Sequence, residues 1–405
     1  MASQRSLKGL DWLNFFVANV QTGFGPFIAI YLTSQKWTEL AIGSVLSLGT
    51  TVAMLSQLPA GALVDAMPSK RLAAALAIIA ITLSALLFLV APSTFGISLA
   101  EILHGFASCM LTPAIAAVSV SLVGLGALGE RLGRNARYAS LGNGISAAVM
   151  GLAGYYLTGS AVFALTAALG IPALLALWQI EGTRQVRAAR ERRRAHEPLG
   201  RELAHLFLDR RLLAFGACII LFQMADAGML PFVGNEIAAS AGSVANLVIA
   251  ACIVVPQIVV AGLSPLVGRA AERHGRRAVL LIGFAAEPVR GLLFGLIALP
   301  VPVVLIQSLD GISAAVIGVL LPLIAADIAR ERGHFNLAMG VIGLAVGAGA
   351  TISTILAGWA AAAWGSRVAF LALALAGLAG TALVWLIMPE TAPQTAEAEP
   401  VSSSS

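Results

Sequence analysis

The chain has 405 residues, of which 59% are hydrophobic and only 11% are charged. Because soluble domains carry roughly 25% charged residues, this composition excludes a soluble enzyme, a disordered protein and a disulfide-stapled secreted domain. The net charge of +5 would suggest nucleic-acid binding in a soluble protein. In a chain this apolar, its meaning depends on where the basic residues fall.

Twelve apolar stretches are long enough to cross a bilayer, which takes about 20 residues per helix. They cover residues 11–33, 39–64, 72–91, 95–124, 136–157, 160–180, 212–238, 244–267, 278–299, 301–326, 336–362 and 367–388. Pro300 and Pro302 favour a break between the ninth and the tenth stretch, where the connection is short. The sequence therefore predicts an all-α membrane protein with twelve spans.

Of the 25 Lys and Arg residues, 22 lie on alternate connections, all on one side of the membrane. The other side has only Lys36 and Arg367, and Arg290 lies inside a span. Because basic loops stay in the cytoplasm, we expect both termini to be cytoplasmic in a bacterial inner (plasma) membrane. Contact with anionic membrane lipids explains the basic charge without any nucleic acid.

The chain is predicted to divide into four parts. Two six-helix bundles, residues 1–180 and 212–389, flank a basic cytoplasmic linker over 181–211, the longest polar stretch. The tail over 390–405 combines Pro, Ala and Glu with a run of serines, a composition typical of disordered segments.

The two predicted bundles repeat each other weakly at a shared offset near 207 residues. The matches pair Gly61 with Gly268, Asp65 with Glu272, Ala18-Asn19 with Ala225-Asp226, and His104-Gly105 with Asp310-Gly311. Each pair lies in corresponding spans or loops, which indicates a six-plus-six duplication. Parallel halves related by an axis along the membrane normal are a known plan of transporters.

At these loops the sequence resembles the major facilitator superfamily, whose members carry Gly-x-x-x-Asp-Arg-x-Gly-Arg-Arg/Lys after the second span and a degraded copy after the eighth. The first copy here consists of Gly61, Asp65, Lys70 and Arg71, and the second of Gly268, Glu272, Arg273, Gly275, Arg276 and Arg277. The first copy departs from the pattern at Ala66 and Pro68. The resemblance implies two pseudo-symmetric six-helix bundles and a monomeric transporter.

Such a loop can act as a conformational latch. A carboxylate at one helix end that faces basic groups and the start of another helix can hold one conformation closed. We expect this role for Asp65 and Glu272. For the arginines of the second copy, the alternative is that they only fix the topology.

Ionisable side chains inside a span are costly and mark functional sites. The resemblance implies that the first, fourth, seventh and tenth helices line a central cavity. Candidates on these helices for proton coupling or substrate contact are Asp310, Asp226, His104, Glu101, Asn19, Asn14, Gln21 and Gln223.

Four of these candidates can carry protons. Glu101 and His104 are three residues apart, so they share one helical face and can exchange a proton. They also lie near the outer end of their span, where water can solvate them. Asp226 and Asp310 have no basic neighbour at helical spacing, and we expect them to take up and release protons.

Two further ionisable residues, Glu287 and Arg290, are three residues apart in the ninth span. The resemblance places this helix at the periphery of its bundle. We therefore expect an internal ion pair that allows both charges to be buried, rather than a transport role.

The sequence contains no phosphate-binding Gly-x-x-x-x-Gly-Lys loop, no His-Glu-x-x-His metal motif and no Ser, His and Asp set at recognisable spacing. We therefore expect no cofactor, no metal and no enzymatic activity. The leading hypothesis is a secondary active transporter that moves a small organic solute by alternating access, coupled to protons, with export as an antiporter favoured. The alternatives are an uncoupled facilitator or uptake permease, and a non-transporting sensor that kept the fold.

Overall fold

Hydroxyl side chains begin three of the long helices in the computed structural model. Thr38, Ser69 and Ser93 cap α3 (Glu39–Ala66), α4 (Lys70–Val90) and α5 (Thr94–Val123), each accepting a hydrogen bond from a first-turn amide. Such caps satisfy amides that a helix start leaves unpaired. The structure describes residues 3–22, 27–156, 159–181, 208–240, 245–297, 300–330 and 334–392.

Helices make up nearly all of these described residues. The first half of the chain also contains α1 (Gln4–Thr22), α2 (Phe27–Ser34), α6 (Leu128–Tyr156) and α7 (Gly159–Trp178). The second half contains α10 (Arg210–Asp226), α11 (Met229–Ser240), α12 (Ala245–His274), α13 (Arg276–Leu296), α14 (Pro300–Ile306), α15 (Ser308–Ala329), α16 (Phe335–Trp364) and α17 (Ser366–Ile387).

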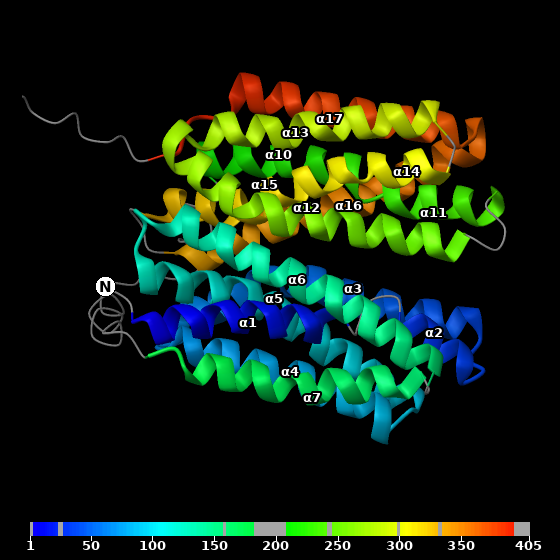
Figure 1. The fold of residues 1–405 in the computed structure, drawn as a ribbon, viewed down its shortest axis with the longest axis horizontal. Helices are drawn as coiled ribbons and strands as arrows, with labels where there is room; N and C mark the ends of the chain where they lie inside the picture. Colours follow the sequence, from blue (N-terminus) through cyan, green and yellow to red (C-terminus); the bar gives the residue numbers. More distant parts are fainter. Residues whose placement is uncertain are drawn as a thin grey trace, which may run out of the picture.

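The helices form two bundles that lie side by side, α1 to α7 in one and α10 to α17 in the other (Figure 1). Each bundle has its own apolar core. Phe88 and Phe163 are fully buried in the first, and Phe215, Phe284 and Phe370 in the second. The predicted all-α class with two six-helix bundles is confirmed. The predicted linker lies mostly, and the tail almost wholly, outside the described residues.

Two of the predicted spans each consist of two helices in the structure. The seventh is broken between Asp226 and Met229, and the tenth at Gln307. In the first, the residues between α1 and α2 lie outside the described part of the chain. At the break in the seventh, the amide of Gly228 donates 2.9 Å to the hydroxyl of Ser353 on α16. A contact with a distant helix thus replaces a helical hydrogen bond, and Asp226 becomes the last residue of a half-helix.

Ten helical segments in the described part of the chain are long and apolar enough to cross a membrane. The predicted first and fifth spans do not meet both conditions. Polar side chains such as Asp11 and Asn14 lower the hydropathy of α1, which is a continuous helix. Helix α6 begins with a charged turn around Glu130. At 29 residues α6 is nevertheless long enough to span, since an α-helix rises about 1.5 Å per residue.

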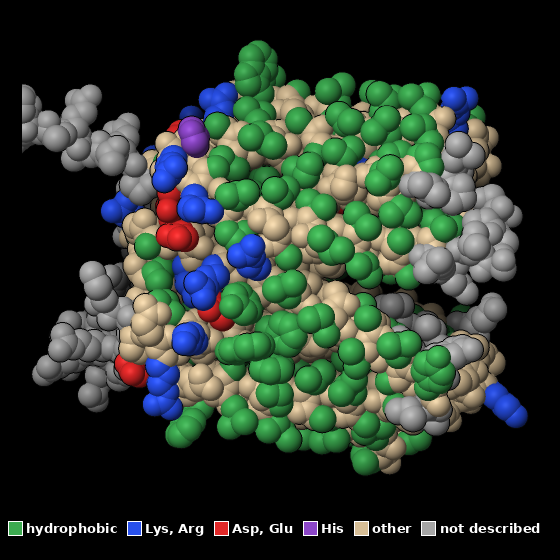
Figure 2. Space-filling model, in the orientation of Figure 1, with side chains coloured by type: hydrophobic (Ala, Val, Ile, Leu, Met, Phe, Trp, Pro, Cys, Tyr) green, Lys and Arg blue, Asp and Glu red, His purple; other side chains and the backbone are tan. Residues whose placement is uncertain are grey.

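Lys and Arg side chains gather with acidic ones at one end of the molecule, and few lie at the other (Figure 2). We call this the basic end; its described basic residues include Lys70, Arg71, Arg131, Arg134, Arg137, Arg269, Arg273, Arg276 and Arg277. Helix α1 begins and α17 ends at this same end (Figure 1). At the opposite end, a notch separates the two bundles (Figure 2).

Candidate functional site

Three helices of the second bundle bring one guanidinium and three carboxylates together. Arg290 on α13 donates from Nη2 to Asp226 at 2.9 Å, and from Nη1 to Asp310 at 2.5 Å and Glu287 at 3.3 Å. We call these four residues the Arg290 cluster. Arginine suits this task, because its planar group offers five donors in fixed directions.

The Arg290 cluster is buried on one side and accessible on the other. The side chains of Arg290 and Glu287 are 1% and 0% exposed, whereas those of Asp226 and Asp310 are 28% and 25% exposed. With all four groups ionised, three carboxylates and one guanidinium would carry a net charge of −2. Burial makes such an excess of charge costly.

The sequence predicts two separate sets for these four residues, and that separation is wrong. Asp226 and Asp310 have no basic neighbour at helical spacing, and we expected Glu287 and Arg290 to form an ion pair of their own. Helical spacing reveals only contacts within one helix, whereas Arg290 reaches α10 and α15 from α13. The three carboxylates come within 4.8 Å of one another. A metal ion there would compete with the guanidinium of Arg290 for the same oxygens.

The equivalent positions of the first bundle carry neutral or weakly basic groups. At the repeat offset, Asn19 corresponds to Asp226 and His104 to Asp310. The amide nitrogens of Asn19 and Asn14 each donate 2.7 Å to a carbonyl of their own helix, so both side chains fold back on α1. The Arg290 cluster therefore has no acidic counterpart at these two positions of the first bundle.

The remaining candidates lie in different surroundings. Gln21 and Gln223 are both half-buried, and Gln223 packs against the backbone of α16 at Gly349. His104 is half-buried on α5. Glu101, one turn earlier, is 5% exposed, so the alternative that water solvates it is wrong.

At the basic end, each bundle extends one carboxylate to the other bundle. Asp65, near the end of α3, accepts from the amide of Leu337 at 2.8 Å and from the side chain of Asn336 at 2.6 Å. These residues begin α16, whose own N-cap side chain makes no capping bond. Glu272, near the end of α12, accepts from the amide of Glu130 at 3.0 Å, in the first turn of α6. The two contacts are related by the sequence repeat.

The basic residues of the two loops instead hold their own bundles together. Lys70 donates 2.6 Å to the carbonyl of Val64, and Arg276 donates 2.7 Å to that of Ala271, so each binds the end of the preceding helix. Their neighbours bind the end of the last helix of each bundle: Arg71 the carbonyl of Trp178, and Arg277 that of Trp385. Cations at helix C-termini are favourable. Arg273 is exposed at the end of α12.

Gly61 and Gly268 allow the two bundles to touch at these contacts. A Cβ atom on Gly61 would lie 2.4 Å from the carbonyl oxygen of Asn336, and one on Gly268 would lie 2.1 Å from that of Gly129. Side chains would therefore prevent the backbones from approaching. Glycine is required at both positions for closure of the basic end.

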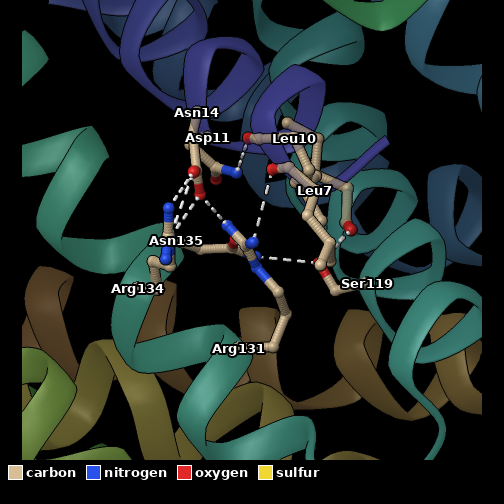
Figure 3. Close-up of polar contacts among 9 residues, drawn as sticks. Leu7, Leu10, Asp11, Asn14, Ser119, Arg131, Arg134 and Asn135 are labelled. Carbon is tan, nitrogen blue, oxygen red and sulfur yellow. Dashed lines mark hydrogen bonds and ion pairs between the residues drawn. The ribbon is translucent and has the colours of Figure 1, made fainter. Parts of the chain in front are cut away.

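The first bundle contains a largely buried polar network that was not predicted from the sequence (Figure 3). Asp11 on α1 lies between two arginines of α6, bound to Arg131 at 2.5 Å and Arg134 at 2.6 Å. Arg131 also donates 2.8 Å to Asn135, whose amide donates 2.8 Å to Ser119 on α5. Asp11 had been treated as the edge of a span and the arginines as topology signals. Two arginines at i, i+3 on one helical face were the available clue.

A third arginine of α6 faces the other bundle. Arg137 donates 2.8 Å to the carbonyl of Ala261 on α12. The first three turns of α6 therefore bind α1 through Arg131 and Arg134, and bind α12 through Arg137 and the amide of Glu130. This segment connects the two bundles.

The loop between α12 and α13 is also bound by the end of the described chain. Gly275 precedes α13 and offers no side-chain cap. Glu390 supplies one instead, accepting from the amides of Arg276 at 2.8 Å and Arg277 at 3.1 Å. Burial raises the pKa of Glu390, but backbone donors from Ala392, Arg276 and Arg277 outweigh it, so the pKa lies below the ordinary value.

Comparison with known proteins agrees with this architecture. The sequence profile of the Major Facilitator Superfamily matches residues 10–260 and again residues 217–404. Proteins of Mycobacterium tuberculosis strains CDC 1551 / Oshkosh and ATCC 25618 / H37Rv, both described as uncharacterized MFS-type transporters, are 34% identical over 393 residues, covering 96% of this chain and 94% of theirs.

The chain belongs to the major facilitator superfamily. The solved structure of the MFS proton:xylose symporter XylE, bound to 6-bromo-6-deoxy-D-glucose, has a TM-score of 0.69 at 16% identity over 96% of both chains. This likeness establishes the MFS fold alone. Membership of the family makes this protein an integral membrane transporter and not an enzyme.

Proposed function

We propose that this MFS transporter is a secondary active carrier of a small organic solute, coupled to protons at the Arg290 cluster. The basic end faces the cytoplasm, so that both termini lie inside a bacterial inner membrane. This orientation follows from the positive-inside rule. The carrier acts as a monomer and alternates between states open to either side of the membrane.

The observation that supports proton coupling is the shared guanidinium. Three carboxylates compete for Arg290, and two of them are about one quarter exposed. If Asp310 binds a proton, its bond to Arg290 weakens and the guanidinium can turn towards Glu287 and Asp226. Uptake of a proton therefore changes the contacts between α10, α13 and α15, three helices that must move during transport. It also lowers the unbalanced buried charge.

Two latches support alternating access. Asp65 caps α16 and Glu272 contacts the start of α6, each across the boundary between bundles. Their bonds hold the basic end closed while the bundles separate at the opposite end. A state open to the cytoplasm requires both latches to break. The Asp11 network ties α6 to α1, so movement of α6 is passed on to a helix that lines the cavity.

The charges also restrict the solute. Carboxylates outnumber cationic groups in the Arg290 cluster, and Arg290 is already engaged by three of them. A polyanion would therefore find little to bind it. The half-buried neutral groups Gln21 and Gln223 can supply hydrogen bonds, which suits a neutral or cationic organic solute. The amides of Asn14 and Asn19 are buried and bound to α1 in this state.

Binding and transport assays test the proposal. A thermal-shift screen of the purified protein against a broad solute library identifies a ligand. In proteoliposomes, we expect an imposed pH gradient to drive accumulation of that solute, and a protonophore to abolish the accumulation. The sign of the gradient that drives uptake distinguishes export by exchange from symport.

The two alternatives give different results in these assays. Flux that is indifferent to the pH gradient identifies an uncoupled facilitator. A protein that binds no solute, and whose distances between spin labels on the two bundles never change, is a sensor that kept the fold. Either result overturns the proposed coupling.

A further inference from the structure

A second buried carboxyl group lies in the first bundle, far from the Arg290 cluster in sequence. Glu101 on α5 is 5% exposed, and its Oε1 has no hydrogen-bond partner among the described residues. Its Oε2 lies over the bare backbone of Gly49 on α3, 2.2 Å from where a Cβ atom would stand. The carboxyl group thus fills the space that a side chain at position 49 would take.

The backbones of α3 and α5 touch at this place. A Cβ atom on Gly105 would lie 2.9 Å from the carbonyl oxygen of Gly49. The Glu101 carboxyl group therefore lies directly beside a contact where the two backbones are too close to admit a side chain. Helix α3 is also the helix whose far end carries Asp65, the latch to α16.

Few charged groups can balance an ionised Glu101. His104, one turn along α5, is the titratable residue nearest to it on its own helix. Helix α16 has no ionisable residue in Phe335–Trp364, and Ser84 of α4 donates to the carbonyl of Ala100 instead. The charged groups of α1, α3, α4 and α6 lie towards the helix ends, in the Asp11 network, or, for Arg137, on the carbonyl of Ala261. Helix α15 also contacts α5, and its acids Asp310 and Asp327 bind Arg290 and Arg276.

A buried carboxylate with an unpartnered oxygen is costly, whereas a neutral carboxyl group is much less so. We propose that Glu101 is a second proton-binding group, protonated while the basic end is closed, and that loss of its proton weakens the α3–α5 contact and releases the Asp65 latch. The proton passes to water, and the carboxylate leaves Gly49 to reach that water. Low pH therefore favours the closed basic end.

This inference rests on the proposed alternating access but uses a site separate from the Arg290 cluster. It adds a pH-dependent conformational equilibrium that needs no solute. Because a ligand shifts an equilibrium only by its differential affinity for the two states, the proton must bind the closed state more tightly. The equilibrium is therefore measurable in protein without substrate.

Spin labels report the closure directly. Gly126→Cys and Arg269→Cys place labels on opposite bundles at the basic end, and the three native cysteines are buried. In the parent protein, raising the pH from acidic to alkaline should lengthen the distance between the labels. In Glu101→Gln, which mimics the neutral acid, the distance should stay short at every pH. The inference is overturned if this variant keeps the pH dependence of the parent.

A pair of glycine variants tests the geometry without removing the acid. Gly49→Ala should displace the Glu101 carboxyl group and lengthen the distance already at acidic pH. Gly43→Ala on the same helix is the matched control, because a Cβ atom at position 43 would meet nothing within 4 Å. Equal distances in the two variants would contradict the proposed contact.

The two proposals fail separately. Asp310→Asn should abolish proton-coupled flux and keep the pH-dependent distance. Loss of the pH dependence in Asp310→Asn would place the proton that controls closure at the Arg290 cluster and overturn the role of Glu101. Unchanged flux in Asp310→Asn would overturn the proposed coupling and leave the role of Glu101 intact.

Discussion

Arg290 is the residue on which the second bundle depends most, because one guanidinium satisfies carboxylates from α10, α13 and α15. Its own Nε and the Oε2 of Glu287 have no partner among the described residues. The cluster is thus held together by charge while part of its hydrogen-bonding capacity is unused. The guanidinium of Arg290 can therefore exchange one carboxylate partner for another at a low cost in free energy.

Arg290→Gln should lower the stability of the protein by about 3–5 kcal/mol, because it leaves buried acids unpaired. Glu287→Gln in the same chain should restore part of the loss, since it removes the most deeply buried acid. Thermal unfolding in detergent measures both changes. If the double variant is no more stable than Arg290→Gln alone, Glu287 does not depend on Arg290.

Glu390→Ala should destabilise the protein by about 1 kcal/mol, the usual cost of losing a helix cap. Because its pKa in the folded protein lies below the ordinary value of 4.5, the stabilisation is complete above that pH. It is lost as the pH falls through the lower folded value. Unfolding measured across acidic pH should therefore show the parent and the variant converging, and a constant difference would contradict this role.

At the scale of helices, the two bundles exchange equivalent contacts. The end of α3 caps α16, and the end of α12 contacts α6, with the acidic residues 207 positions apart. A carboxylate at a helix N-terminus gains from both hydrogen bonds and the helix dipole. The closed state is thus held by two similar carboxylate contacts, together with the close packing of α12 on α6 and of α3 on α16.

Asp65→Ala and Glu272→Ala should each weaken closure by about 1 kcal/mol, a roughly fivefold rise in the population open at the basic end. Asp65 makes more hydrogen bonds, so its variant should show the larger effect. The double variant should show the sum, because the two sites share no partner. Distances between spin labels at positions 126 and 269 measure the open population in the two single variants and in the double variant. If neither single variant raises the open population, the latches are rejected.

Gly268→Ala should prevent close contact between α12 and α6, because the new methyl group would overlap the backbone at Gly129. The expected result is a protein that folds and stays open at the basic end. Gly262→Ala on the same helix is the control, since a Cβ atom there meets nothing within 4 Å. Thiol labelling of a cysteine placed at the basic end measures the difference, and equal labelling would contradict it.

At the scale of the whole molecule, the sequence was sufficient for the fold class, because hydropathy and loop charge are read one segment at a time. The repeat offset also identified Asp65 and Glu272 as a related pair. Contacts between helices were not accessible in this way. Spacing along α13 suggested that Arg290 pairs with Glu287, but it gave no sign of Asp226 or Asp310.

Other features depend on distant parts of the chain and could not be predicted from local sequence. The break after Asp226 requires Ser353 of α16, which replaces a helical hydrogen bond. Asp11 is buried only because Arg131 and Arg134 approach it from α6. Both cases involve a polar group whose partner lies more than 100 residues away.

Proton movement driven by solute is the most direct test of the central claim, coupling at the Arg290 cluster. Proteoliposomes containing a pH-sensitive dye are given a gradient of the solute found by the binding screen. The parent and Ser308→Ala, a half-buried control on the same helix, should change the internal pH. Asp310→Asn should exchange labelled solute across the membrane but leave the pH constant. A pH change of undiminished size in Asp310→Asn would contradict the account.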